Sequence, residues 1–198
     1  MDREEIKKKL MQAYELYSAE DYNKAFPLFV QGAEAGFLPA YVIVGDCYWN
    51  GNGVEADRKK AILYYLTAAD AGYGEALMRM GDFYLRCNNP QKAIDTFVEA
   101  TEKGEIDAYF NLGSIYYYGA EGIERNLSVA ATFFEKYISL ISDNSEAFFL
   151  LGRCYVFMKN SNLSKAEEMF RISASLGNQK AAKDYNTLQL GGHIIDIF

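Results

Sequence analysis

Small and aromatic residues recur at helical spacing in paired segments of this chain, with polar residues between them. Ala40, Gly45 and Tyr48 mark a first segment, and Ala61 and Ala68 mark a second. Because Ala61 and Ala68 are seven residues apart, they lie on one face of a helix. Short side chains let another helix come close, and a ring fills the space beside them. The pattern therefore predicts two short helices packed together around a glycine-rich turn.

Each of these landmarks returns along the chain at a period in the thirties. Self-similarity at such a period, with helical spacing inside each unit, is the signature of a helical solenoid. The recurring residues are the first-helix alanines Ala40, Ala76, Ala108, Ala147 and Ala181; the glycines Gly45, Gly81, Gly113 and Gly152; the tyrosines Tyr48, Tyr84, Tyr116 and Tyr155; and the second-helix alanines Ala25, Ala61, Ala93, Ala130 and Ala166.

An independent signal marks the start and end of the second helices. An Asp or Asn stands four residues before every second-helix alanine, where its side-chain oxygen can accept from backbone N–H groups of the first turn. In most units a glycine suited to a left-handed helix end stands eleven residues after the same alanine. The expected caps are Asp21, Asp57, Asn89, Asn126 and Asn162, and the expected terminating glycines are Gly36, Gly72, Gly104 and Gly177.

These signals predict an all-α, right-handed superhelix of about five helix pairs and a C-terminal capping helix, in one domain over residues 1–190. The repeat units span about 3–36, 37–72, 73–104, 105–141 and 144–177, followed by the cap at 178–190 and an apolar tail at 191–198. Pro27 lies inside the second helix, so we expect a kink there or a late start near Ala25. The expected helices are 1–18, 21–35, 38–50, 57–71, 74–87, 90–103, 106–118, 126–140, 145–159, 163–176 and 178–190.

Residues 38–72 carry a family resemblance. After the alanine, glycine and tyrosine landmarks comes a turn that fits the pattern GxGVxxDxxKA, formed by Gly51, Asn52, Gly53, Val54, Asp57, Lys60 and Ala61. This arrangement resembles the Sel-one-like repeat, a relative of the tetratricopeptide repeat, and the likeness extends over about residues 14–188. The resemblance implies a solenoid fold and a role as a protein-interaction scaffold, without naming a partner.

Charge and composition narrow the expected partners and compartment. The net charge of -7 and the dispersed lysines argue against a nucleic-acid partner. No window approaches the roughly 18 uninterrupted apolar residues of a membrane span, so no membrane insertion is expected. The charged start of the chain has no secretory core. The three cysteines form no CxxC pair, which favours reduced structural thiols and a cytoplasmic protein.

Residues suited to catalysis or metal binding do not gather in the sequence. The only histidine, His193, lies in the tail, and there is no zinc-ligand spacing, phosphate-binding loop or nucleophile elbow. Paired carboxylates such as Glu167 and Glu168 fall on an outer helix face. We therefore expect a non-catalytic protein without a cofactor or metal, and an enzyme with an unrecognised acidic site is the alternative.

In a right-handed stack of helix pairs, the first helices line the concave face. The resemblance carries the ligand-contacting positions of tetratricopeptide proteins onto this chain at three residues before the repeat glycine and one, four and five after it. Aromatic and charged side chains there are typical of a protein-recognition surface. The alternative is that these rings pack on neighbouring helices and fill the face. The predicted binding residues are Val42, Asp46, Trp49, Asn50, Met78, Asp82, Leu85, Arg86, Phe110, Ser114, Tyr117, Tyr118, Phe149, Arg153, Val156 and Phe157.

The apolar tail has two interpretations. The pattern favours a lid in which the tail folds back on the last helix, because apolar side chains left in water would be a liability. Alternatively the tail docks on another protein or on a second copy, giving a homodimer with a structural role. The residues concerned are Ile194, Ile195, Ile197 and Phe198.

Overall fold

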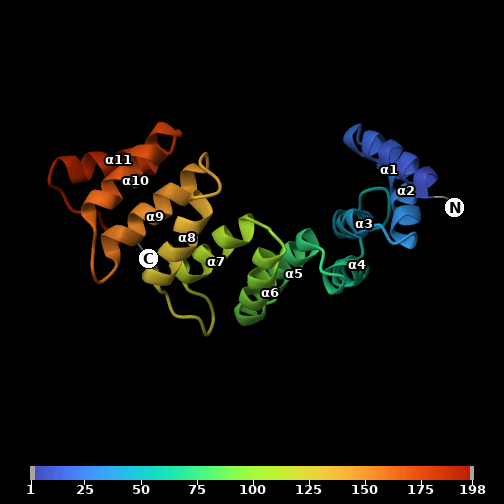
Figure 1. The fold of residues 1–198 in the computed structure, drawn as a ribbon, viewed down its shortest axis with the longest axis horizontal. Helices are drawn as coiled ribbons and strands as arrows, with labels where there is room; N and C mark the ends of the chain where they lie inside the picture. Colours follow the sequence, from blue (N-terminus) through green and yellow to red (C-terminus); the bar gives the residue numbers. More distant parts are fainter. Residues whose placement is uncertain (1–2, 197–198) are drawn as a thin grey trace.

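The computed structural model describes residues 3–196, and this part of the chain contains eleven α-helices. The predicted helix ends agree with the observed ones to within two residues. Figure 1 shows the helices following one another as antiparallel pairs along a curved row, from α1 at one end to α11 at the other. The helices are α1 (Arg3–Ser18), α2 (Tyr22–Glu34), α3 (Leu38–Asn50), α4 (Arg58–Asp70), α5 (Gly74–Arg86), α6 (Pro90–Glu102), α7 (Asp107–Tyr118), α8 (Leu127–Ile138), α9 (Ser145–Phe157), α10 (Leu163–Ser175) and α11 (Gln179–Gln189).

One aromatic ring locks each of the middle helix pairs. The ring stands four residues after the second-helix alanine and lies against the repeat glycine of the first helix in its own unit. A Cβ atom added at these glycines would lie only 2.4 to 2.7 Å from the nearest ring atom. The lack of a side chain therefore lets the paired helices approach closely. The glycine–ring pairs are Gly45 with Tyr65, Gly81 with Phe97, Gly113 with Phe134, and Gly152 with Phe170.

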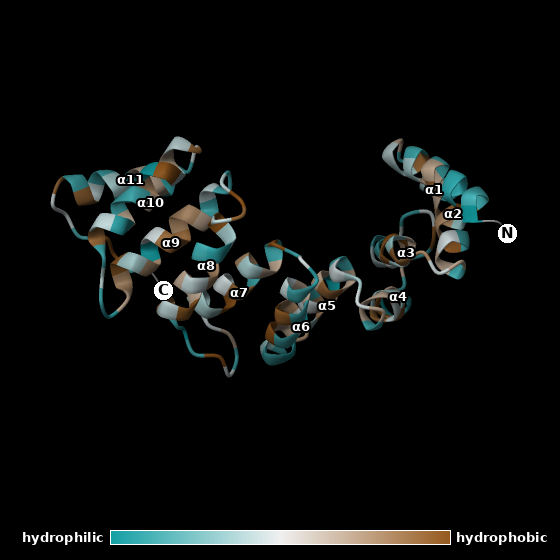
Figure 2. Ribbon diagram, viewed as in Figure 1, coloured by the Kyte–Doolittle hydropathy of each residue, from teal (hydrophilic) through white to brown (hydrophobic). Residues whose placement is uncertain are grey.

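The apolar core runs along the row as three successive clusters of buried residues. One joins α1, α2 and α3, a second runs from α3 to α7, and the third runs from α7 to α11. Figure 2 shows hydrophobic positions where paired helices face each other and hydrophilic positions along the outer side of α1. Among the described residues, no helix is both long enough and apolar enough to cross a membrane.

The helix ends confirm most of the capping prediction. The side chains of Asp57, Asn89, Asn126 and Asn162 each accept a hydrogen bond from a backbone N–H of the turn that they open. The predicted terminating glycines all have positive φ, between 76° and 93°. Local side-chain chemistry thus fixes where the second helices begin and end.

The start of α2 departs from expectation in two ways. Asp21 stands at the cap position but makes no cap hydrogen bond, and its carboxylate instead accepts from Lys24 Nζ at 2.7 Å. The late start near Ala25 is wrong, because α2 already begins at Tyr22 and continues past Pro27. Burial of Ala25 and Phe29 against α1 and α3 holds this segment in place despite the proline.

Candidate functional site

The first of two pockets that contain predicted binding residues lies between α3 and α5. Its volume is about 250 Å³. Five predicted positions come together there, from two consecutive units of the repeat. The lining residues are Asp46, Trp49, Asn50, Tyr65, Arg79, Asp82, Phe83 and Arg86.

A polar network forms the floor of this α3–α5 pocket. Tyr65 is the only tyrosine among the locking rings, and its hydroxyl passes Gly45 to donate to Asp46 Oδ1 at 2.6 Å. Arg79 donates to both carboxylate oxygens of Asp46 at 3.0 Å, in the bidentate geometry that makes such pairs strong. Burial and the bond to Asp46 raise the pKa of the Tyr65 hydroxyl, which therefore stays protonated and donates. The network joins the second repeat unit to the third.

The Trp49 ring forms one wall of the same pocket. The guanidinium groups of Arg58 and Arg86 lie 5.3 and 5.9 Å from its centroid, within cation–π range. Asp82 stands beside them, and desolvation raises the pKa of its carboxyl while Arg79 and Arg86 oppose that rise. The wall thus combines a large half-buried ring with charges of both signs, which is the composition of a protein-recognition hot spot.

The second pocket lies between α7 and α9 and has a volume of about 280 Å³. Arg153 lies over the rings of Phe149 and Phe157, at 5.7 and 5.2 Å from their centroids. Burial raises the pKa of the Tyr117 hydroxyl to about 12. This α7–α9 pocket is again aromatic with one central guanidinium group. Its lining residues are Tyr117, Tyr118, Glu146, Phe149, Leu150, Arg153 and Lys180.

The tail returns from α11 to the edge of the α7–α9 pocket. Ile194 packs against the third core cluster, as the lid interpretation expects, whereas Ile195 is 73% exposed. Arg125 donates to both carboxylate oxygens of Asp196, at 2.6 and 3.1 Å, and Arg153 Nη2 donates to the Ile195 carbonyl at 3.0 Å. The expectations for Ile197 and Phe198 lie outside the described residues.

The remaining predicted residues line neither pocket. Val42 is 1% exposed and belongs to the core, and the Phe110 ring packs against Phe134 and Tyr137. These two side chains therefore pack on neighbouring helices, which was the alternative to a binding role. The others are Met78, Leu85, Ser114, Val156 and Phe157; of these, Met78 and Val156 pack against the core and Leu85 is exposed.

Sequence reasoning missed several lining residues. Arg79 and Leu150 both stand two residues before the repeat glycine, so this recurring position was a usable signal. Tyr65 is a tyrosine where the other units have Phe29, Phe97, Phe134 and Phe170, and that substitution was a second signal. No comparable feature of the sequence indicated the other lining residues, Phe83, Glu146 and Lys180.

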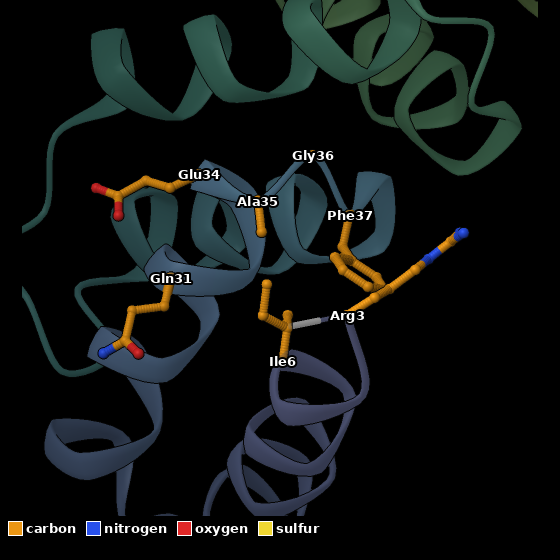
Figure 3. A pocket seen from close by; sticks show the side chains of 7 residues that line it. All are labelled: Arg3, Ile6, Gln31, Glu34, Ala35, Gly36 and Phe37. Atoms are coloured by element: carbon orange, nitrogen blue, oxygen red, sulfur yellow. The ribbon is translucent and has the colours of Figure 1, made fainter. Parts of the chain in front are cut away.

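A third hollow, of about 570 Å³, lies at the N-terminal end between α1 and α2. Figure 3 shows Arg3 pointing to one side and Gln31 and Glu34 to the other, around an apolar centre of Ile6 and Phe37. Because its polar groups diverge, the hollow has no convergent set of ligand contacts. Within residues 3–196 no three His, Cys, Asp or Glu side chains gather as metal ligands.

Comparison with curated proteins finds relatives that are much longer than this chain. It is 29% identical over 123 residues to the chitin synthase regulator SKT5 of Saccharomyces cerevisiae, covering 59% of this chain and 18% of that protein. It is 29% identical over 178 residues to DAP3-binding cell death enhancer 1 of Rattus norvegicus, covering 85% of this chain and 34% of that protein. The chain thus spans about a third or less of these relatives.

Comparison with solved structures confirms the predicted fold class. The structure of c5321, a protective antigen of uropathogenic Escherichia coli strains that displays an SLR fold, superposes with a TM-score of 0.79 at 23% identity, covering 94% of this chain and 42% of that one. The family model described as Sel1 repeat matches residues 38–73, 106–140 and 145–178, which is more than half of the chain. The chain therefore belongs to the Sel1 repeat family.

Proposed function

We propose that this protein is a non-catalytic scaffold that binds a peptide or protein segment on its concave face, with the α3–α5 pocket as the main contact. The observation that carries the proposal is the convergence of Trp49, Arg86 and Asp82 in one pocket formed by two repeat units. A partly buried tryptophan flanked by arginines provides the kind of anchor that dominates protein interfaces.

Two further observations support this proposal. The bidentate pair of Arg79 with Asp46 fixes α5 against α3, so the pocket is formed before a ligand arrives and little ordering is needed on binding. Repeats of this family generally mediate contacts between proteins. The rat relative is also named for binding DAP3, which supports a protein as the class of partner here.

The test is a selection of binding peptides from a random display library, followed by titration of purified peptide and protein. We expect the selected peptides to lose about 30-fold in affinity for the Trp49→Ala variant, the equivalent of a 2 kcal/mol hot spot. Arg86→Ala should weaken them as well. Leu63→Ala removes another exposed large side chain, 62% exposed on the second helix α4, and should leave affinity unchanged.

Equal affinity of the selected peptides for wild type and Trp49→Ala would reject the α3–α5 pocket as the binding site. Weakening by Leu63→Ala to the same extent would point to the convex face instead. Circular dichroism of each variant should match wild type, so that a lost affinity reports the lost contact.

A homodimer formed through the tail is the second candidate. The 73% exposure of Ile195 favours it, while the packing of Ile194 and the pairing of Asp196 within one chain disfavour it. Sedimentation equilibrium tests this candidate, because a monomeric mass at all concentrations would remove it.

We also propose that the protein works in the cytoplasm. Support comes from the buried free thiols of Cys47 and Cys154 on α3 and α9, which suit a reducing compartment. Fractionation of cells that produce the protein would check this proposal.

A further inference from the structure

The C-terminal tail lies on the α7–α9 face as a ligand would. Arg125 comes from the connection between α7 and α8, and Arg153 comes from α9. Arg125 binds the Asp196 carboxylate, and Arg153 binds the Ile195 carbonyl and lies 3.7 Å from Asp196 Oδ1. Ile194 packs against the third core cluster. Among the described residues, the tail therefore contacts this surface through an acidic side chain, a backbone carbonyl and an apolar side chain.

These contacts recognise a simple pattern. The bidentate geometry at Arg125 selects a planar carboxylate, since both oxygens accept from the same guanidinium group. The Ile195 carbonyl that Arg153 binds is a backbone group, which any residue at that position presents. The apolar contact is made two residues before the acid. An extended segment with an aliphatic residue two positions before an Asp presents the same groups.

Charge supports an acidic ligand at this place. The protein carries a net charge of -7, yet two arginines converge at the edge of the α7–α9 pocket. Arg153 is held by Asp184 of α11 at 3.4 Å, and their side chains are only 12% and 15% exposed. Asp184 therefore gives Arg153 an ion-pair partner that does not belong to the tail.

We propose that the α7–α9 face binds an extended partner segment with an aliphatic-x-Asp pattern, and that the tail of this chain is its built-in competitor. The inference rests on the proposed scaffold function and names the partner chemistry of a second surface on the same concave side. It predicts that the wild-type chain binds such a segment weakly and that release of the tail strengthens binding.

The experiment measures binding of a fluorescein-labelled peptide with the sequence of residues 191–198 to the full chain by fluorescence anisotropy. Asp196→Lys in the protein places a like charge next to Arg125 and expels the tail. We expect this variant to bind the wild-type peptide at least about tenfold more tightly than wild-type protein does, the worth of one charge-assisted pair. Asp196→Asn is the milder variant and should give a smaller gain.

A charge exchange provides the control. Arg125→Glu in the otherwise wild-type protein repels Asp196 and so also expels the tail. This variant should not bind the wild-type peptide and should bind a peptide that carries Lys at the position of Asp196. Backbone 15N relaxation gives a second measurement, because Ile195 and Asp196 should become more mobile on the nanosecond timescale in an Arg125→Ala variant if the ion pair holds the tail.

Equal peptide affinity of wild type and Asp196→Lys would overturn the inference, as would peptide binding that ignores the charge at Arg125. Neither result bears on the display peptides that depend on Trp49, so failure of this inference and failure of the proposed function are distinguishable.

Discussion

Gly113→Ala tests the close contact that locks each helix pair. A Cβ atom at this position would lie 2.7, 2.8 and 3.0 Å from three atoms of the Phe134 ring, whereas non-bonded carbons prefer about 3.5–4.0 Å. The ring would have to withdraw by about 1 Å. It is fully buried, with the Phe110 and Tyr117 rings at centroid distances of 5.7 and 6.4 Å, so it has no free space.

The expected cost follows from two opposing effects. Overpacking of a core costs about 1–3 kcal/mol, and the upper part of that range applies to a ring with no free space. Replacing a glycine inside a helix by alanine stabilises the helix by about 1 kcal/mol. The net loss in free energy of unfolding is about 2 kcal/mol, or about 4–8 °C in melting temperature for a chain of this size. Circular dichroism during heating and during urea titration measures it.

Gly32→Ala is the matched control, since Gly32 also lies inside a helix. Its added Cβ would lie 2.5 Å from the end of the Leu10 side chain, which is partly exposed and can rotate away, and 3.1 Å from the Ala40 Cβ, which requires a shift of only a few tenths of an ångström. The control should lose less than half of the free energy that Gly113→Ala loses. Equal stability of the two variants would refute the claim that the ring against the glycine limits helix approach.

Three further predictions concern the thiols and the caps. Cys87 is exposed, whereas burial raises the pKa of Cys47 to about 11 and that of Cys154 to about 12. Alkylation at pH 8 should therefore modify one thiol in the wild-type protein and none in Cys87→Ser, as measured by mass spectrometry. Because the folded state keeps those two protons longer than the unfolded state, the free energy of unfolding should fall as pH rises above about 9, which urea titrations from pH 8 to 10.5 would show. Asp57→Ala should cost about 1 kcal/mol through its lost cap, and Asp21→Ala measurably less because Asp21 makes no cap bond, both checked by urea titration.

The sequence predicted the helices well because their limits depend on neighbours along the chain. Asn126 caps α8 through a backbone N–H three residues away, and such a contact can be recognised from spacing alone. The site was harder to predict. Asp46 and Arg79 are 33 residues apart and Arg125 and Asp196 are 71 apart, so only the packed solenoid brings these pairs together.

The exposure of each predicted binding residue was also beyond sequence reasoning. Transfer of binding positions by register placed Trp49 and Val42 on the same face, but Val42 is 1% exposed and Trp49 lines a pocket. The two residues are seven apart on α3 and point in nearly the same direction. The difference in their exposure therefore comes from what packs against each end of the helix. Register therefore assigns residues to a face of the helix, and the exposure of each one depends on packing.

The covalent attachment of the tail has a consequence for any partner of the α7–α9 face. A flexibly tethered segment acts at an effective concentration in the millimolar range. A free peptide with identical contacts at about 1 μM would then occupy the face about a thousandth as often as the tail does. A successful partner therefore needs additional contacts elsewhere on the solenoid, and the α3–α5 pocket can provide them.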